Sequence, residues 1–504
     1  MIELTAAQVA AATGGRLHAD PDVTVTGAVI VDSRQAGPGA LFVALPGERV
    51  DGHDFAATAV EAGAALVLAA RELDGLPTVV VDDPQAALGD LARHVLETVR
   101  GRADDSAGPK VVAVTGSVGK TTTKDLLGQL LGPEAGAESA ALRGSQAHSS
   151  AAGDDGDAII VPKGSFNNEI GLPLTVLRVT TSTRYLVLEM GADRIGNIAY
   201  LTRIAPPDVG VVLAVGVAHV GHFGSVEAIA KTKGEMVEGV VDGGAVVLNA
   251  DDQRVTAMAG RAAPGTTVQT FGTIPSADVR AEDVTVDAAG RASFTLRVAG
   301  VGGSDEQRAD VVLQLVGAHH VSNALAAATV ALRLGVTVAD VAQRLSSATA
   351  LSPHRMAVTE RPDGVTVIDD AYNANPDSMK AALRTLAVMS GRTRRSVAVL
   401  GEMLELGDGA RVAHDEIGRL VVRLNIKQLI VVGEGAYHIH EGAMQEGSWG
   451  SESIFVPDLA AARSILDESL EPGDVVLVKS SLGAGLAELG DHLSMALTTK
   501  DNNK

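Results

Sequence analysis

Cysteine is absent from this sequence: none occurs among its 504 residues. Without a thiol the chain can form no disulfide, no thiolate zinc site, no iron–sulfur cluster and no cysteine nucleophile. Aromatic residues are scarce as well, at 2% of the sequence. The hydrophobic share of 46% therefore comes mainly from Ala, Val and Leu, and it is ample for folded cores.

Basic residues are fewer than acidic ones, and long hydrophobic runs are missing. The formal net charge is −21, so we expect no general basic surface for duplex nucleic acid and no nucleic-acid partner. No apolar stretch reaches the roughly 18 residues that suggest a membrane-spanning helix. The first residues, Met1 to Ala6, lack the basic and apolar regions of a signal peptide. These absences favour a cytoplasmic enzyme without a membrane partner.

Short apolar strand candidates alternate with helical stretches along almost the whole chain, which predicts an α/β protein with mostly parallel sheets. At about 150 residues per domain, the length suggests about three domains. A polar linker, Gly101 to Pro109, ends the first section, and the third begins near Gly317. We therefore expect domains at 1–105, 106–317 and 318–504.

One segment of the second section, 132–157, consists largely of Ala, Gly, Ser, Asp and Glu. Such a composition cannot bury enough apolar surface to order itself, so we expect a mobile insertion there. The last residues, 498–504, are expected to fray.

The motif with the clearest chemical meaning runs from Lys110 to Lys124. Its apolar stretch 111–114 predicts a buried parallel strand, and a glycine-rich turn and a helix follow. Such a junction binds phosphate, with Lys120 as a cation for the β- and γ-phosphates and Thr121 as a hydroxyl for Mg²⁺. Since the spacing Gly-x-x-Gly-Lys is shorter than the usual pattern, an ordinary turn of small residues is the alternative. The turn comprises Thr115, Gly116, Ser117, Val118, Gly119, Lys120, Thr121 and Thr122.

Polar side chains also stand at the ends of other strands predicted in the second section. Glu189 follows the apolar run 185–188, and His219 follows the run 209–215. Because ligands bind beyond the carboxyl ends of strands in open α/β sheets, these residues indicate a nucleotide–metal site. Glu189 is a suitable oxygen ligand for Mg²⁺ and His219 for a second metal ion; the alternative for each is a structural role in a turn.

With these residues in view, the sequence resembles the ATP-dependent Mur ligases, which build the peptide stem of bacterial cell-wall precursors. Thr115-Gly-x-x-Gly-Lys-Thr121, Glu189-Met-Gly191 and the segment around His219 carry this resemblance. Further stretches resemble the branch of the family that adds D-alanyl-D-alanine. They are Ser165 to Leu174, His219 to Ser225, Lys233 to Glu235, Asp369 to Met379 and Gly401 to Gly407.

The resemblance implies a fold and a reaction. The fold is three α/β domains: an N-terminal uridine-nucleotide domain, a central P-loop ATPase-type domain with a parallel sheet, and a C-terminal Rossmann-like domain. The reaction is an ADP-forming ligation of peptidoglycan synthesis, in which ATP phosphorylates the terminal carboxylate of UDP-N-acetylmuramoyl-tripeptide. The amine of D-alanyl-D-alanine then attacks the acyl phosphate. ATP and Mg²⁺ are thus implied, and the low aromatic content and glycine-rich loops favour a monomer with mobile domains.

The resemblance also implies roles for single residues. Thr121 and Glu189 would bind one Mg²⁺, and His219 would help to bind a second. Lys233 matches a lysine that the family carries as a carbamate, which is an anionic oxygen ligand; taken alone, it is a solvated helix charge. The implied catalytic residues are Lys120, Lys233, His219 and Arg355, the implied ATP contacts beyond the phosphate turn are Asn323, Arg355 and Asp370, and the implied substrate contacts are Ser33, Arg34, Asn167, Asn168, Tyr372, Asn373 and Asn375.

Simpler interpretations stand beside these roles. Asn323 has the residue type of a helix N-cap, Arg355 that of a surface charge, and the asparagines around 167 and 373 are typical of turns. The sequence also departs from the family pattern at His320, where many relatives have an asparagine next to the adenine. After Lys479 a serine replaces the usual glycine.

Three other functions remain as alternatives. One is another ligase of the superfamily, such as folylpolyglutamate synthase or the diaminopimelate-adding Mur enzyme, although segments 165–174 and 369–379 argue against both. A P-loop kinase or nucleotide switch would act without an amine substrate. A binding protein with a relic ATP site is disfavoured by the intact Lys120, Thr121 and Glu189.

Overall fold

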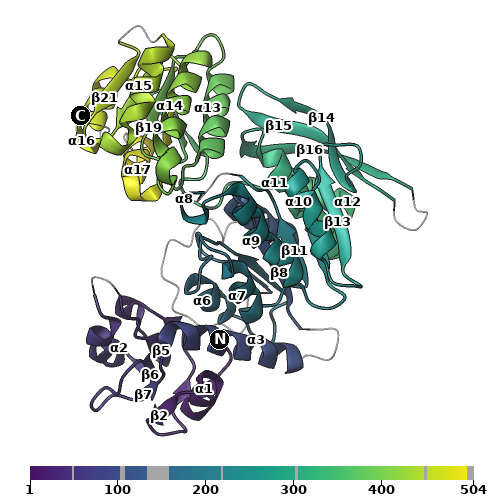
Figure 1. Cartoon of the computed structure of the whole chain (residues 1–504), viewed down its shortest axis with the longest axis vertical. Helices are drawn as coiled ribbons and strands as arrows, with labels where there is room; N and C mark the ends of the chain where they lie inside the picture. Colours follow the sequence, from purple (N-terminus) through teal and green to yellow (C-terminus); the bar gives the residue numbers. More distant parts are fainter. Residues whose placement is uncertain are drawn as a thin grey trace.

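The computed structural model describes residues 1–47, 50–102, 108–132, 158–216, 220–300, 305–447 and 451–495. They form three α/β bodies that follow one another along the long axis of the molecule (Figure 1). Each body is built on a mainly parallel sheet, which confirms the fold class predicted from the alternation of strands and helices. Three features expected from the sequence lie outside the described residues: the insertion from residue 133 on, His219 and the C-terminal tail.

The first body contains a five-stranded sheet of order β2-β7-β6-β5-β4 and a separate β1-β3 pair. Its strands coincide with short apolar runs whose side chains are almost fully buried, such as Leu66 to Ala69. Helix α3 then carries the chain to the second body, and residues of both bodies share one apolar cluster around it. The elements are β1 (Leu4–Thr5), α1 (Ala6–Thr13), β2 (Arg16–His18), β3 (Thr24–Val25), β4 (Val29–Ile30), η1 (Ser33–Gln35), β5 (Ala40–Val43), η2 (Gly52–Phe55), α2 (Ala56–Glu61), β6 (Ala64–Ala69), β7 (Thr78–Val80) and α3 (Pro84–Arg102).

The second body is organised by a nine-stranded sheet of order β16-β15-β14-β13-β12-β11-β8-β10-β9. The strands from β9 to β14 run parallel, and β14, β15 and β16 form an antiparallel extension. The elements are β8 (Lys110–Thr115), α4 (Lys120–Leu131), β9 (Ile159–Ile160), α6 (Gly171–Val176), β10 (Tyr185–Glu189), α7 (Asn197–Ile204), β11 (Val209–Val212), α8 (Val220–Phe223), α9 (Val226–Glu238), β12 (Ala245–Asn249), α10 (Gln253–Ala257), η3 (Met258–Arg261), β13 (Thr267–Gly272), β14 (Val279–Val286), β15 (Arg291–Val298), β16 (Gln307–Val316), α11 (His320–Arg333) and α12 (Val338–Ser347).

The boundary expected at residue 317 does not match the packing. Helices α11 and α12 contribute Ala324 to Ala328, Val341 and Leu345 to the same buried cluster as Val112 of β8 and Leu126 of α4. Both helices therefore belong to the central sheet, because their apolar faces are buried against it. The third body begins after α12.

The third body has a six-stranded sheet of order β17-β18-β22-β19-β20-β21, in which only β17 is antiparallel. Apolar clusters cover both faces of this sheet. The elements are β17 (Ala357–Glu360), β18 (Thr366–Asp369), α13 (Pro376–Ser390), β19 (Ser396–Leu400), η4 (Gly407–Gly409), α14 (Ala410–Arg423), β20 (Gln428–Val432), η5 (Glu434–Ala436), α15 (Tyr437–Glu446), β21 (Ser453–Val456), α16 (Leu459–Ser469), β22 (Val475–Lys479), η6 (Leu482–Ala484) and α17 (Ala487–Met495).

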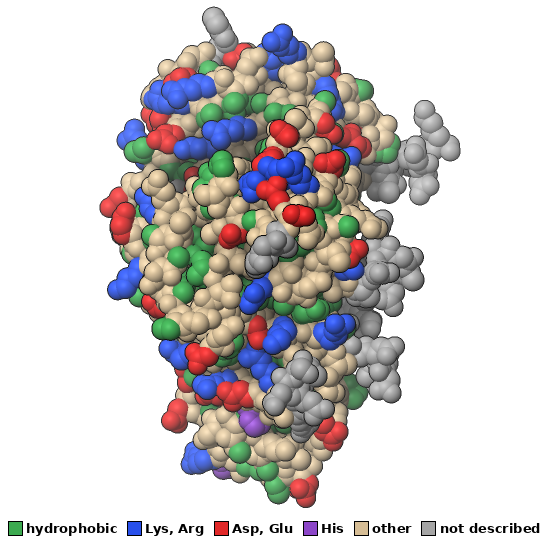
Figure 2. Space-filling view, turned by 90° about the vertical axis from the view of Figure 1, so that its right-hand side faces the viewer, with side chains coloured by type: hydrophobic (Ala, Val, Ile, Leu, Met, Phe, Trp, Pro, Cys, Tyr) green, Lys and Arg blue, Asp and Glu red, His purple; other side chains and the backbone are tan. Residues whose placement is uncertain are grey.

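The edge of the central sheet where the site was expected does form. Strands β10, β8, β11 and β12 are parallel neighbours, so their carboxyl ends meet at one edge. The helix predicted after the glycine-rich turn is present as α4, and Ser225 caps α9 by accepting a hydrogen bond from the Ala228 N–H at 3.1 Å. On the face of the molecule shown in Figure 2, acidic and basic side chains are interspersed. None of the described helices is long and apolar enough to span a membrane.

Candidate functional site

The glycine-rich turn between β8 and α4 has the backbone geometry of an anion cradle. Gly119 has a φ of +85° and precedes the first residue of α4 without any side-chain cap on the helix N-terminus. A Cβ at Gly119 would collide with the side-chain oxygen of Asn323, and one at Gly116 would lie 2.8 Å from the Cβ of Leu213. Glycine is thus required at both positions, and the N–H groups at the start of α4 can face an anion.

Lys120 of this turn and Lys233 lie close enough together for their charges to interact. Lys120 Nζ donates a hydrogen bond to the Gly116 carbonyl at 2.9 Å. Burial lowers the pKa of Lys120, and Glu189 acts in the opposite direction. Lys233 of α9 is 4% exposed, and burial together with the charge of Lys120 lowers its pKa to about 7. Within the described part of the chain neither lysine forms an ion pair with a carboxylate.

A group of oxygen atoms lies beside the start of α4. Thr121 Oγ1 donates to Glu189 Oε2 at 2.9 Å and lies 3.1 Å from the Ser165 hydroxyl. Asn167 Nδ2 donates to the other carboxylate oxygen of Glu189 at 2.8 Å. Glu189 is 1% exposed, so its charge is held in a buried, oxygen-rich setting. Hard cations such as Mg²⁺ prefer this donor type.

Arg355 brings a third cation to the turn from the segment that leads into the third body. Its Nη2 donates to Ser165 Oγ at 3.1 Å, and its guanidinium carbon lies 4.2 Å from the ring centroid of Tyr372. The buried Nε atom of Arg355 has no hydrogen-bond partner in the described structure. A buried donor without an acceptor costs free energy, so this atom is suited to an anionic ligand.

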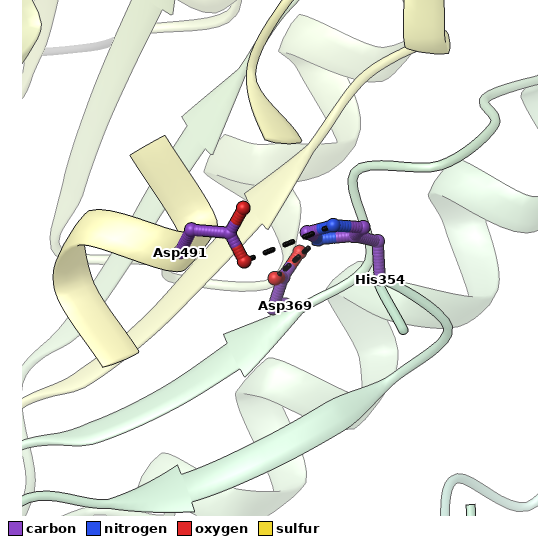
Figure 3. Close-up of side chains that lie close together, drawn as sticks. All are labelled: His354, Asp369 and Asp491. Carbon is purple, nitrogen blue, oxygen red and sulfur yellow. Dashed lines mark hydrogen bonds and ion pairs between the residues drawn. The ribbon is translucent and has the colours of Figure 1, made fainter. Parts of the chain in front are cut away.

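The residue before Arg355 is held by two carboxylates (Figure 3). His354 Nδ1 lies 2.7 Å from Asp369 Oδ2, and its Nε2 lies 3.8 Å from Asp491 Oδ1. The carboxylates thus contact different nitrogens of one ring. His354 also has a φ of +55°, a left-handed conformation that is uncommon for a residue with a side chain. The cluster therefore anchors the loop that carries Arg355.

Asp370 and Lys479 are joined inside the third body. Lys479 Nζ donates to Asp370 Oδ2 at 2.5 Å and to the Asn373 carbonyl at 2.8 Å. Asp370 Oδ1 accepts the Met356 N–H at 3.1 Å. Both carboxylate oxygens are thus occupied by the chain itself, and the expected ribose contact of Asp370 stays a prediction.

Several predicted residues have local structural partners. Asn168 Oδ1 accepts the Gly171 N–H at 2.9 Å beside the start of α6, and Asn375 caps α13. Thr115 Oγ1 donates to the Met190 carbonyl at 2.9 Å. Asn323 Nδ2 lies 3.2 Å from His320 Nδ1, at the mouth of the phosphate turn. For Asn168 this contact matches the simpler interpretation of a turn residue, whereas Asn375, for which a turn was the alternative, is a helix cap.

The residues expected to bind uridine nucleotide lie in the first body. Ser33 and Arg34 form the short helix η1 after β4, and the Arg34 side chain is 87% exposed. Arg34 Nη2 donates to Asp32 Oδ2 at 2.7 Å, and this bond is the main reason why the pKa of Asp32 is lowered. Ser33 and Arg34 thus belong to the first body, whereas the phosphate turn before α4 belongs to the second.

Sequence reasoning missed two residues of the site. Ser165 connects Thr121 to Arg355, and only its place at the start of the Ser-Phe-Asn-Asn run pointed to it. His354 anchors the Arg355 loop, and its only signal was its position next to Arg355.

Comparison with family models gives a match for each body. The model of the Mur ligase family, catalytic domain, matches residues 27–95. The Mur ligase middle domain matches 114–331, and the Mur ligase glutamate ligase domain matches 354–482.

Known proteins similar to this chain agree with these matches. The chain is 46% identical to the UDP-N-acetylmuramoyl-tripeptide--D-alanyl-D-alanine ligase of Mycobacterium tuberculosis strain H37Rv, over 98% of both sequences. It is 32% identical to the ligase of the same name from Bacillus subtilis, over 97% of this chain and 98% of the relative. A crystal structure of MurF from Acinetobacter baumannii superposes with a TM-score of 0.80 at 29% identity, covering 98% of this chain and 99% of that one. The MurF ligase of Thermotoga maritima in complex with ADP gives a TM-score of 0.73 at 28% identity, with 93% and 97% covered.

Proposed function

The chain belongs to the Mur ligase family, and we propose on that basis how its residues carry out the family's chemistry on one particular pair of substrates. The enzyme is an ATP-dependent ligase of peptidoglycan synthesis that joins D-alanyl-D-alanine to UDP-N-acetylmuramoyl-tripeptide. One observation carries the assignment of the site: Thr121 of the phosphate turn, Glu189 of β10 and Arg355 come from separate elements and are linked by hydrogen bonds, directly or through Ser165.

ATP binds with its phosphates on the turn at the start of α4. Lys120, the free N–H groups of the helix and the unpartnered Nε of Arg355 supply positive charge there. Phosphoryl transfer needs little covalent help from a protein and much charge stabilisation, which these groups are placed to provide.

The oxygen donors beside the turn fit Mg²⁺. Thr121 Oγ1 lies within hydrogen-bonding distance of both Ser165 Oγ and the Glu189 carboxylate, and the pair formed by Thr121 and Glu189 is buried. These residues would hold the ion, and bound Mg²⁺ would neutralise phosphate charge during transfer. His219 stays a predicted ligand of a second ion.

The reaction itself proceeds in two transfers. An oxygen of the terminal tripeptide carboxylate attacks the γ-phosphorus, and the bond to ADP breaks. The free amine of D-alanyl-D-alanine then attacks the carbonyl carbon of the acyl phosphate; the amine loses a proton, the C–O bond to phosphate breaks and the amide forms. Approach of the third body to the turn, seen in the contact between Arg355 and Ser165, supports exclusion of water from the acyl phosphate.

Lys233 is proposed to act as a carbamate. A lysine must be neutral to combine with carbon dioxide, and burial lowers the pKa of Lys233 to about 7. The product would be an anionic oxygen ligand near Lys120, which would remove the cost of an unpaired buried cation.

The uridine-nucleotide end of the tripeptide substrate is assigned to the first body, with Ser33 and Arg34 as contacts. The exposed guanidinium of Arg34 is suited to a phosphate. Tyr372, Asn373 and Asn375 lie after β18, and we assign them to the region where the two substrates meet. That the enzyme acts as a monomer in the cytoplasm stays a prediction.

The test is phosphate release from ATP and Mg²⁺ with UDP-N-acetylmuramoyl-tripeptide, with and without D-alanyl-D-alanine, followed by product mass. We expect release to require both substrates and the product to carry the added dipeptide. Release that ignores D-alanyl-D-alanine would instead indicate a nucleotide switch or kinase.

A further inference from the structure

The segment that leads from the second body to the third is tied to the phosphate-binding helix. Gln129 of α4 forms two hydrogen bonds with the backbone of Thr349: its Nε2 donates to the carbonyl at 3.0 Å, and its Oε1 accepts the N–H at 3.0 Å. Ser352 Oγ donates to Asp125 Oδ2 at 2.7 Å. Residues 349 and 352 are therefore fixed on one side of α4.

Asp125 is itself held rigidly. Its other oxygen accepts a hydrogen bond from Lys124 Nζ at 2.5 Å, and the side chain of Lys124 is 2% exposed. Asp125 lies one helical turn after Thr121, so the acceptor of Ser352 and the phosphate-binding residues belong to the same rigid helix. A rigid partner lowers the number of positions that the connecting segment can adopt.

These contacts close a ring through Arg355. Thr121 contacts Ser165, and Ser165 accepts a hydrogen bond from Arg355, which follows Ser352 by three residues. Ser352 returns to α4 through Asp125. Arg355 is thus held to the second body by the hydroxyl of Ser165 and, through the chain, by the hydroxyl of Ser352.

We propose that Asp125, Gln129 and Ser352 are positioning residues that set where Arg355 lies over the phosphate turn. This inference rests on the proposed function, because Arg355 is assigned there to the ATP phosphates. The helix that begins at the phosphates also fixes the start of the segment that carries the arginine, so a shift of this segment along α4 would move the guanidinium away from the transferring phosphoryl group. Catalytic groups that are held in place before the reaction need no reorganisation during it.

The kinetic test compares Ser352→Ala in two backgrounds. In the otherwise unchanged enzyme we expect kcat and kcat/KM for ATP to fall together by about tenfold, as for an interaction needed in the transition state. In an Arg355→Lys background the same change should cost less than about twofold, because Ser352 acts through Arg355. Ser352→Thr, which keeps a hydroxyl, should recover most of the lost activity.

The matched control is Ser347→Ala. Ser347 is exposed and donates only to the Arg344 carbonyl at 3.1 Å, so its loss should leave the kinetics unchanged. An equal loss for Ser352→Ala in both backgrounds would mean a merely structural role and would overturn the proposal, as would unchanged kinetics in the otherwise unchanged enzyme.

A second measurement needs no substrate. Amide hydrogen exchange at Thr349 should become about tenfold faster in Gln129→Ala, since the side-chain acceptor of that N–H is removed. Unchanged exchange would overturn the inference alone. Failure of the unaltered enzyme to ligate the two substrates would overturn the proposed function alone, so the two failures can be told apart.

Discussion

The lysines at the phosphate-binding edge of the central sheet have no carboxylate partner among the described residues, whereas the lysine at the corresponding edge of the third sheet has one. Lys479 ends β22 of the third sheet, is 1% exposed and is paired with Asp370 at 2.5 Å. At the central edge, Lys233 is 4% exposed and has no carboxylate partner among the described residues, and Lys120 has only a carbonyl. A buried ion pair has a structural role, because each ion compensates the cost of removing the other from water.

Unpaired buried charge has the opposite meaning. Glu189 compensates the charge of Lys120 only in part, and no carboxylate among the described residues pairs with Lys233, so we expect the remaining compensating charge to come from a ligand or from modification. The edge of the central sheet is thus suited to bind anions. At the edge of the third sheet the charges of Lys479 and Asp370 neutralise each other, and Asp370 holds the Arg355 loop. The following substitutions test this difference, from the largest expected effect to the smallest.

Lys120→Ala should abolish ligation, with a loss of about a thousandfold or more, because a cation on the transferring phosphate is removed. The free energy of unfolding should stay the same or rise, since no carboxylate loses its partner. Phosphate release and urea unfolding measure the two effects. Normal turnover by a folded Lys120→Ala protein would refute the assignment of the ATP site.

Lys233→Ala should lower turnover by about a hundredfold, and a small added carboxylic acid should restore part of it by taking the place of the carbamate. The control is Lys231→Ala, which changes an exposed lysine of the same helix. Full activity of Lys233→Ala without any additive would rule out the carbamate.

Lys479→Met should destabilise the protein by about 3 kcal/mol, because the buried Asp370 carboxylate is left without its partner. Lys233→Met should instead leave the free energy of unfolding unchanged or raise it. Chemical denaturation of both variants measures the contrast, and the double change of Lys479→Met with Asp370→Asn should recover part of the loss. Equal destabilisation by both lysine changes would remove the distinction between the two edges.

The smallest expected effect is on the pH dependence of stability, and it comes from His319. It stacks on His320 with ring centroids 4.1 Å apart, and burial lowers its pKa to about 4. Its pKa is thus lower in the folded protein than in the unfolded chain, where it is about 6.5. Its contribution to stability is complete above pH 6.5 or so and is lost as the pH falls towards about 4. We expect about 2 kcal/mol of acid destabilisation from this group, discounted for its partial exposure, and a flatter pH profile in His319→Gln.

Much of the central edge could be predicted from local sequence. The run Val111 to Val114 formed the expected strand, the glycines formed the turn, and Glu189 lies at the end of the neighbouring strand. These features depend on residues close to one another in the chain: apolar periodicity specifies a buried strand, and only glycine fits the backbone of the turn.

The domain boundary was predicted less well. Helix α11 begins at His320, close to the expected boundary, and its apolar surface does not say which sheet it covers. Packing against Leu126 of α4 assigned it to the second body. A helix can bury the same apolar face against either of two neighbouring sheets, so this choice belongs to the tertiary structure.

By itself, the sequence determined the alternation of strands and helices, the phosphate turn and the polar residues at strand ends, because each depends on a short stretch of chain. Only the tertiary structure decided which lysines are neutralised and which are left for a ligand. Lys479 meets Asp370 across 109 positions, and Arg355 meets Ser165 across 190. Ion pairs and hydrogen bonds form over a few ångströms, so the role of a charged side chain depends on which distant segment the fold brings beside it.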